Sequence, residues 1–276
     1  MRCKTMLRFS VKYITLVSLA SCSGGAALAQ SSLNDMASNP RVCDQADCAI
    51  QVERGAKRPL IDAAGWFFGI PRKILQWDRR AQNHQVSDAT VCEVTDYMVK
   101  SNLGDTVVRV NQYAPIKEWQ RLTSNHRIAP GWRYTVGSLK WLKYTFVPGR
   151  LFGKDEYNPY SNSIYLYSDM PMLGLAEAAY PKDISQRDRP GTYAAVQELP
   201  VVALWHETIA TNEVIQYVSI HGSSEEIENV RHDLYARYGI ETAGAVSQVL
   251  PDGSGLFAIV GAVAGHTTAA VENRSP

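Results

Sequence analysis

Apolar residues recur at helical or strand spacing over much of the chain. Residues 88–102 hold apolar side chains at helical spacing and predict a helix. Residues 105–110, DTVVRV, are short and β-branched and predict a strand. In residues 163–167, apolar Ile164 and Leu166 alternate with more polar neighbours, which is typical of a half-buried strand.

Prolines mark the starts of the predicted helices. Pro71 suits the first turn of a helix within the aromatic segment at residues 60–80. Pro171 does the same for a helix over 171–186. A second helical pattern runs from Thr192 to about Gly239, and Pro200 should kink or divide it.

Two further segments have weaker patterns. Ser168 and Asp169 can cap the helix at 171–186. Residues 132–147 are aromatic-rich, and we expect strand character there, with a turn or short helix near Gly137. The loop before residue 163 is polar and aromatic.

This order of elements predicts an α+β fold: a small sheet with an edge strand beside a central helix, and a mainly helical C-terminal half. We expect a signal peptide at 1–22, a tether at 23–55, a globular domain at 56–240 and a small-residue apolar helical segment at 241–276.

Charge narrows the function classes. The 276 residues include 28 basic and 27 acidic ones, and four of the basic residues lie in the first 22. The remainder therefore carries a small negative charge, whereas a dedicated nucleic-acid binder normally has a basic excess. We expect no nucleic-acid partner, and an enzyme, an inactive relative of one, or an envelope-bound scaffold remains possible.

The N-terminus resembles an export signal, because a basic start precedes the short apolar run Tyr13–Ala20. This run is too short to span a bilayer. Residues 19–22, Leu-Ala-Ser-Cys, resemble a bacterial lipobox, which predicts a lipid anchor on Cys22; residues 27–29, Ala-Leu-Ala, offer an ordinary cleavage site instead. We favour lipidation, because the lipobox adjoins the apolar run. The protein would then be a periplasm-facing lipoprotein, at the outer membrane by preference, or else periplasmic.

Three cysteines remain in the mature chain. Cys43 and Cys48 could close a small loop in an oxidising compartment. Three cysteines cannot all pair within one chain, and the sequence leaves the partners of Cys43, Cys48 and Cys92 open.

The most informative segment is Leu175–Asp183, LAEAAYPKD, which follows a polar loop and a strand. Zincin metallopeptidases present their zinc helix in this setting, with the motif His-Glu-x-x-His. Residues 149–216 resemble a bacterial zincin-like family of the gluzincin type, in GRLFGKDEYNPYSNSIYLYSDMP, LAEAAYPKDI and PVVALWHETIATNEVIQY. The resemblance implies a zincin-like fold.

The chain departs from that motif at both histidines. Ala176 replaces the first and has no donor atom, and Tyr180 replaces the second with a phenol, which is a poor zinc ligand. Glu177, the general base of the motif, remains as a vestigial catalytic residue. We therefore expect no zinc cofactor at the usual place. The alternative is that Glu177 has no functional role and is exposed to solvent on a surface helix.

The downstream helix contributes the other candidates. The resemblance places the third zinc ligand of such families at Glu207, with His206 and Glu213 nearby as weak metal candidates. Residues 206–210 superficially resemble the zinc motif, but Ala210 occupies the position of its second histidine. This segment by itself is therefore not expected to bind a metal ion. An apolar stripe on the same helix is expected to join the core: Val202, Trp205, Ile209 and Ile220.

Three arrangements of these residues remain open. Glu177, Tyr180, His206 and Glu207 could form a buried hydrogen-bonded network that replaces the metal. They could form a remodelled weak metal site, or lie scattered on the surface. The first arrangement is favoured.

The C-terminal stretch 255–271 contains Gly261 and Gly265, a spacing that lets helices approach closely in a membrane. Its 17 residues, with His266 among them, are marginal for a membrane span. A helix packed on the domain, or a hairpin with 240–250, is the favoured alternative.

Three functions follow in order of preference. The first is an exported, lipid-anchored zincin-like protein that has lost zinc catalysis and acts in binding or envelope structure, with an unidentified protein partner. The second is an active hydrolase or peptidase with a non-standard metal site around Glu177, His206 and Glu207. The third is a membrane-associated scaffold unrelated to peptidases.

Overall fold

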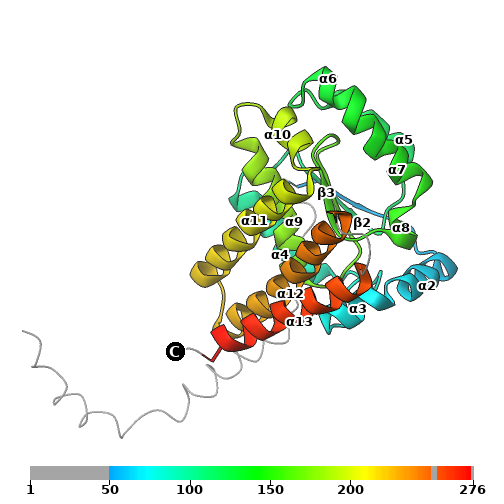
Figure 1. Ribbon diagram of the computed structural model, residues 1–276. Coiled ribbons are helices and arrows are strands. Elements are labelled where there is room, and N and C mark those ends of the chain that lie inside the picture. Colours follow the sequence, from blue (N-terminus) through cyan, green and yellow to red (C-terminus); the bar gives the residue numbers. More distant parts are fainter. Residues whose placement is uncertain (1–49, 250–253, 275–276) are drawn as a thin grey trace, which may run out of the picture. The chain divides into compact units, whose positions relative to one another are not determined.

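A small mixed sheet lies within a mainly helical α+β fold (Figure 1). The structure is a computed structural model and describes residues 50–249 and 254–274. The strand order is β1-β2-β4-β3. Strands β1 (Val52–Arg54), β2 (Val107–Val110) and β4 (Ser163–Leu166) are parallel, and β3 (Glu156–Asn158) is an antiparallel edge strand.

Helices cover the sheet and make up the C-terminal half (Figure 1). In chain order they are α2 (Pro59–Phe68), α3 (Ile70–Gln76), α4 (Asp88–Lys100), α5 (Pro115–Ser124), α6 (Pro130–Trp132), the π-helical turn η1 (Arg133–Gly137), α7 (Ser138–Phe146), α8 (Gly149–Phe152), α9 (Pro171–Ser185), α10 (Pro190–Val196), α11 (Pro200–His221), α12 (Ser224–Val249) and α13 (Ser254–Glu272).

The two faces of the sheet have different chemistry. Val108 and Val110 of β2 and Ile164 of β4 belong to the main core, which also holds the buried faces of α4 and α9. The alternate residues point the other way. There Tyr165 of β4 stacks on Tyr144 of α7, with ring centroids 5.2 Å apart.

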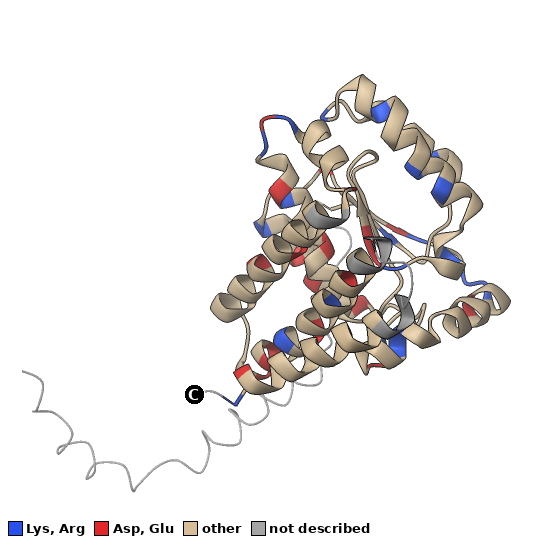
Figure 2. Cartoon of the chain, viewed as in Figure 1, with Lys and Arg blue, Asp and Glu red and all other residues tan. Residues whose placement is uncertain are grey.

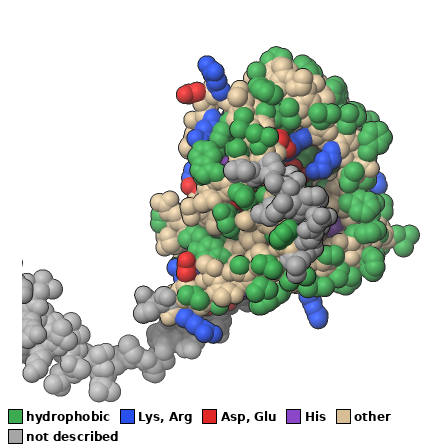
Figure 3. Space-filling model, in the orientation of Figure 1, with side chains coloured by type: hydrophobic (Ala, Val, Ile, Leu, Met, Phe, Trp, Pro, Cys, Tyr) green, Lys and Arg blue, Asp and Glu red, His purple; other side chains and the backbone are tan. Residues whose placement is uncertain are grey.

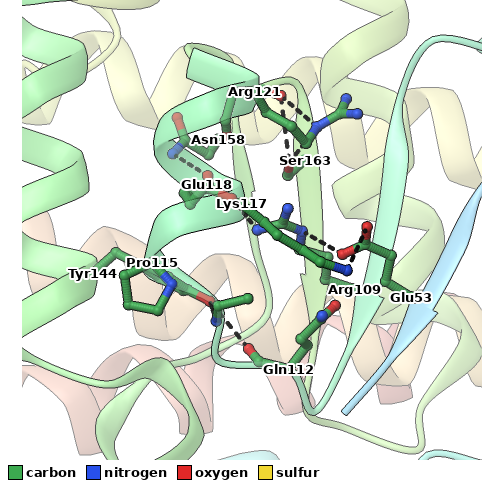
Figure 4. Close-up of polar contacts among 12 residues, drawn as sticks. Glu53, Arg109, Gln112, Pro115, Lys117, Glu118, Arg121, Tyr144, Asn158 and Ser163 are labelled. Carbon is green, nitrogen blue, oxygen red and sulfur yellow. Dashed lines mark hydrogen bonds and ion pairs between the residues drawn. The ribbon is translucent and has the colours of Figure 1, made fainter. Parts of the chain in front are cut away.

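A buried ion cluster ties the second face together (Figure 4). Arg109 of β2 is fully buried and pairs with Glu118 of α5, and its Nε lies 3.4 Å from Glu53 of β1. Asn158 of β3 donates to Glu118 at 3.2 Å. Because α5 and α7 cover this face, β4 is buried along its whole length. The expectation of a half-buried strand is therefore wrong.

Three other local expectations are wrong. The expected strand at 132–147 is absent, since residues 133–146 form η1 and α7; the short helix expected near Gly137 is present as η1. Helical packing of its aromatic side chains against α5, as in the 4.9 Å contact between Trp119 and Trp141, has overridden the strand propensity. β1 lies inside the expected tether at 23–55, and β3 inside the expected polar loop. Both strands are three residues long and exist through pairing with a longer neighbour.

The expected cap of α9 also has a different role. Met170 occupies the N-cap position without a side-chain hydrogen bond. Asp169 instead accepts hydrogen bonds from Ser87 and Thr90, both at 2.7 Å, and so holds the start of α4. The carboxylate therefore joins two helices that pack side by side instead of capping one.

The predicted helices after residue 88 are confirmed. α4 and α9 match the expected ranges, and Pro200 begins α11, so it divides the long helical pattern. Pro71 lies in the first turn of α3. α12 continues through residue 240, where we expected a domain boundary.

Helix α13 packs antiparallel on α12. A Cβ atom on Gly261 would lie 2.1 Å from the backbone oxygen of Gly239, and one on Gly265 would lie 2.1 Å from that of Tyr235. The two glycines thus permit a close helix pair, as the packed alternative predicts. In the described part of the chain, no helix combines the length and apolar character needed to cross a membrane.

Cys92 is disulfide-bonded and buried on α4. Its partner lies outside the described residues, as do the candidate lipidation site Cys22 and the two cysteines Cys43 and Cys48.

Candidate functional site

The helix that carries Glu177 is held against the edge of the sheet. Glu177 lies in the middle of α9 and is 2% exposed. As an edge strand, β3 has backbone N–H groups that the sheet does not use. That of Tyr157 donates to Glu177 Oε2 at 2.8 Å. The strand that contacts this helix through Glu177 is therefore β3, from the segment expected to be a loop, whereas the predicted strand β4 lies inside the sheet.

Arg237 of α12 is the centre of the cluster, and the sequence reasoning missed it. Its Nη2 lies 2.7 Å from Glu177 Oε1, 3.1 Å from Glu207 Oε1 and 3.2 Å from the hydroxyl of Tyr180. Helices α9, α11 and α12, which contribute these four residues, lie side by side (Figure 1). One guanidinium group thus connects three helices.

All four predicted network residues are buried and adjoin one another. His206 stacks on Tyr180, with ring centroids 4.2 Å apart and an interplanar angle of 23°. Glu207 follows it on α11 and turns toward Arg237. The four side chains belong to one cluster, in which the guanidinium of Arg237 contacts three of them.

His206 also belongs to a neighbouring polar group. Its Nδ1 lies 2.6 Å from Gln197 Nε2 and 3.3 Å from Asp183 Oδ2. Burial raises the pKa of Asp183, but hydrogen bonds from His206, Tyr193 and Arg187 outweigh it and hold that pKa below its ordinary value. His206 is therefore oriented from its Nδ1 side.

Glu213 does not join His206 and Glu207. It pairs with Lys182 and accepts a hydrogen bond from the Tyr97 hydroxyl at 3.2 Å. The three weak metal candidates thus have three different sets of partners. Among the residues that the structure describes, no group of three or more His, Cys, Asp or Glu side chains is arranged to hold a metal ion.

The apolar stripe predicted on α11 is not in the core. Trp205 and Ile220 are exposed. The buried face of the helix carries instead His206 and Glu207 together with the core residues Ala210, Val214 and Val218. The helix is rotated so that Glu207 contacts Arg237 while Val214 and Val218 pack in the core, which leaves the predicted stripe outside the buried face.

The residues around Arg237 do not fit a zinc ion. Ala176 has no donor atom, and the hydroxyl of Tyr180 accepts from Arg237. A divalent cation between Glu207 and Tyr180 would lie against the guanidinium, and the two positive charges would repel each other in a buried site.

Burial controls the proton affinities in the cluster. It raises the pKa of Glu177 to about 8; Arg237 opposes that rise and Glu207 adds to it. Burial alone would lower the pKa of Arg237, but Glu207 and Glu177 outweigh it and raise that pKa further. Two carboxyls share one cation here, so a proton on Glu177 leaves the guanidinium balanced by Glu207.

A cavity of about 340 Å³ opens onto the cluster. Glu177, Tyr180, His206, Glu207 and Arg237 all line it. Within the described residues, Glu207 Oε2 and Arg237 Nε are buried without a hydrogen-bond partner. The cavity can therefore accept a polar ligand.

We expect Glu177→Gln to change how stability depends on pH. Between pH 4.5 and about 8, folded Glu177 keeps a proton that the unfolded chain releases. The free energy of unfolding of the native protein should therefore lose up to about 1.4 kcal/mol per pH unit from this group as pH rises. Glutamine has no proton to release, so the free energy of unfolding of the variant should rise relative to that of the native protein over that pH range.

Urea unfolding of both proteins at pH 5, 6, 7 and 8 measures this difference. Glu225→Gln, on the exposed first turn of α12, is the matched control and should follow the native protein. If the free energy of unfolding of the native protein minus that of the variant stayed constant, or grew, as pH rises, the raised pKa of Glu177 would be contradicted.

No protein-family model, curated protein or solved structure matches the chain. The function must therefore be argued from the cluster and its cavity.

Proposed function

We propose that this protein is an exported, lipid-anchored, zincin-like pseudoenzyme in which Arg237 has taken the place of the catalytic zinc ion. Its function would be to bind a partner in the cell envelope, or to support envelope structure, through the cavity that the cluster lines. The observation that carries the proposal is the contact of one guanidinium nitrogen with Glu177, Tyr180 and Glu207.

The surroundings of the cluster support the same interpretation. Glu177 stands at the general-base position of the zinc motif, Tyr180 at its second histidine and Glu207 at the expected third ligand. The three side chains converge from α9 and α11, beside an antiparallel edge strand. A cation that holds them together replaces the structural role of the metal but supplies no activated water.

The metal content of the purified protein tests the proposal. We expect zinc well below one atom per chain by emission spectrometry, even after incubation with zinc and dialysis. The guanidinium of Arg237 lies between the candidate ligands and carries a positive charge, so added zinc should not bind there. Stoichiometric zinc that is lost in His206→Ala would instead favour the active hydrolase with a non-standard metal site around Glu177, His206 and Glu207.

The predicted anchor is tested separately. Cells fed radioactive palmitate should label the native protein but not Cys22→Ala. The absence of label from both would remove the anchor and leave an exported protein without lipid.

A further inference from the structure

Helix α2 has the reverse of the usual amphipathic pattern. On a water-facing helix, apolar residues turn toward the core and charged ones toward solvent. On α2, Leu60 is 88% exposed and Phe67 is 64% exposed. Asp62, the one charged residue within α2, turns inward, where both oxygens of its carboxylate pair with the guanidinium of Arg150.

The exposed apolar residues form one continuous helix face. Leu60, Ala63 and Phe67 are spaced three and four positions apart and therefore share that face. Trp66 and Phe68 border it, and Phe68 contacts Phe152 of α8, with ring centroids 4.7 Å apart. The interior side is fixed by Gly65, whose Cβ would lie 2.4 Å from the backbone oxygen of Arg150.

The figures place this face at the edge of the fold. Helix α2 lies at the right of Figure 1, where hydrophobic side chains project in Figure 3. The ribbon of α2 in Figure 2 is mostly uncharged. The contacts of Asp62 and Gly65 fix the rotation of the helix, so the apolar face cannot turn inward without breaking the Asp62–Arg150 pair.

We propose that this face, formed by Leu60, Ala63, Trp66, Phe67 and Phe68, binds the surface of a lipid bilayer. Tryptophan and phenylalanine residues on a short helix are suited to the boundary between headgroups and acyl chains. The exposed Lys57 and Arg58 immediately precede the helix and can contact anionic headgroups.

The position of the helix in the chain favours a membrane over a protein partner. Only 27 residues separate Cys22 from the first described residue, Ile50, and α2 begins at Pro59. Even a fully extended chain of that length spans at most about 95 Å. The inference rests on the proposed lipid anchor, because a lipid on Cys22 would keep the domain near the bilayer. Helix α2 is the first helix after this anchor in the described part of the chain, so it would lie near the membrane surface.

Vesicle flotation of the unlipidated mature chain, from Ser23 to Pro276, tests the face without the anchor. With vesicles of phosphatidylethanolamine and phosphatidylglycerol, we expect the native chain to float. Leu60→Ser combined with Phe67→Ser should weaken binding at least tenfold. Ile220→Ser is the matched control, because Ile220 on α11 is 68% exposed and should not contact the bilayer.

The outcomes separate the two proposals. Equal flotation of the native chain and the α2 variant, or no flotation of the native chain, would overturn the membrane-binding face whatever the state of Cys22. A concentration-dependent dimer that the α2 variant abolishes would also overturn it, in favour of self-association. Because both substituted side chains are exposed, the variant should keep the native circular dichroism spectrum.

Discussion

Replacement of Arg237 by methionine should lower the free energy of unfolding by about 3–5 kcal/mol, because the buried carboxylate of Glu207 loses its compensating cation and Glu177 loses a hydrogen-bond donor. Glu177 and Glu207 are both less than a tenth exposed and both lie within hydrogen-bond distance of its Nη2. Methionine fills a similar volume but can neither donate a hydrogen bond nor balance a charge.

Thermal unfolding gives a direct measure. For a domain of this size the loss corresponds to a fall in Tm of about 10 °C. Arg231→Met is the matched control: it lies on the same helix, and its side chain is partly exposed, with its nearest acidic partner, Glu272, at 3.8 Å. Surface ion pairs of this kind contribute about 0–1 kcal/mol.

A charge-neutral variant separates the electrostatic cause from a packing defect. In Arg237→Met with Glu177→Gln and Glu207→Gln, the uncompensated carboxyls are gone. Stability should recover by several kcal/mol, because a buried ion cluster can often be replaced by neutral residues of similar volume at little cost. A triple variant as unstable as Arg237→Met alone would show that packing, and not charge balance, is what Arg237 provides.

The sequence predicted the elements whose cause is local. Pro171 and Pro200 fix helix starts through backbone geometry, and the stretch 105–110, rich in β-branched residues, contains the strand it predicts. The three-residue strands β1 and β3 could not be found in this way, because they depend on pairing with strands distant in sequence. The aromatic segment at 132–147 carries both helix and strand signals, and only its tertiary neighbours decide between them.

In the candidate site, too, some residues could be predicted from local sequence and others only from the tertiary structure. The proposed resemblance pointed to Glu177, Tyr180 and Glu207, and the structure brings these three side chains to one guanidinium group. Arg237 lies 57 residues after Tyr180, in a helix that the motif does not include. One signal was available: Asp233, Arg237 and Glu241 repeat every four residues on one face of α12, which is unusual for a helix with many small apolar residues. That pattern indicates a buried polar face, but it does not identify the partner.

The proposed zincin-like site predicts that zinc will bind when histidines are placed at residues 176 and 180 and Arg237 is removed. In Ala176→His with Tyr180→His and Arg237→Ala, two imidazoles would stand four residues apart on α9, and Glu207 would face them from α11. Shortening Arg237 also provides space, since Ala176 is 1% exposed and the larger side chain needs room. We expect about one zinc per chain after dialysis, and an affinity at least ~10³-fold above that of the native protein.

Two matched variants make the result specific. Adding Glu207→Ala should remove the zinc, because it deletes the third ligand. Introducing only the two histidines, with Arg237 kept, should give weak binding, because the guanidinium would still lie at the proposed metal position and repel the ion. If this double variant bound zinc as tightly as the triple variant, Arg237 would not stand where the metal does. If a folded triple variant bound none, α9 and α11 would not have the geometry of a zinc site, and the zincin-like interpretation would have to be abandoned.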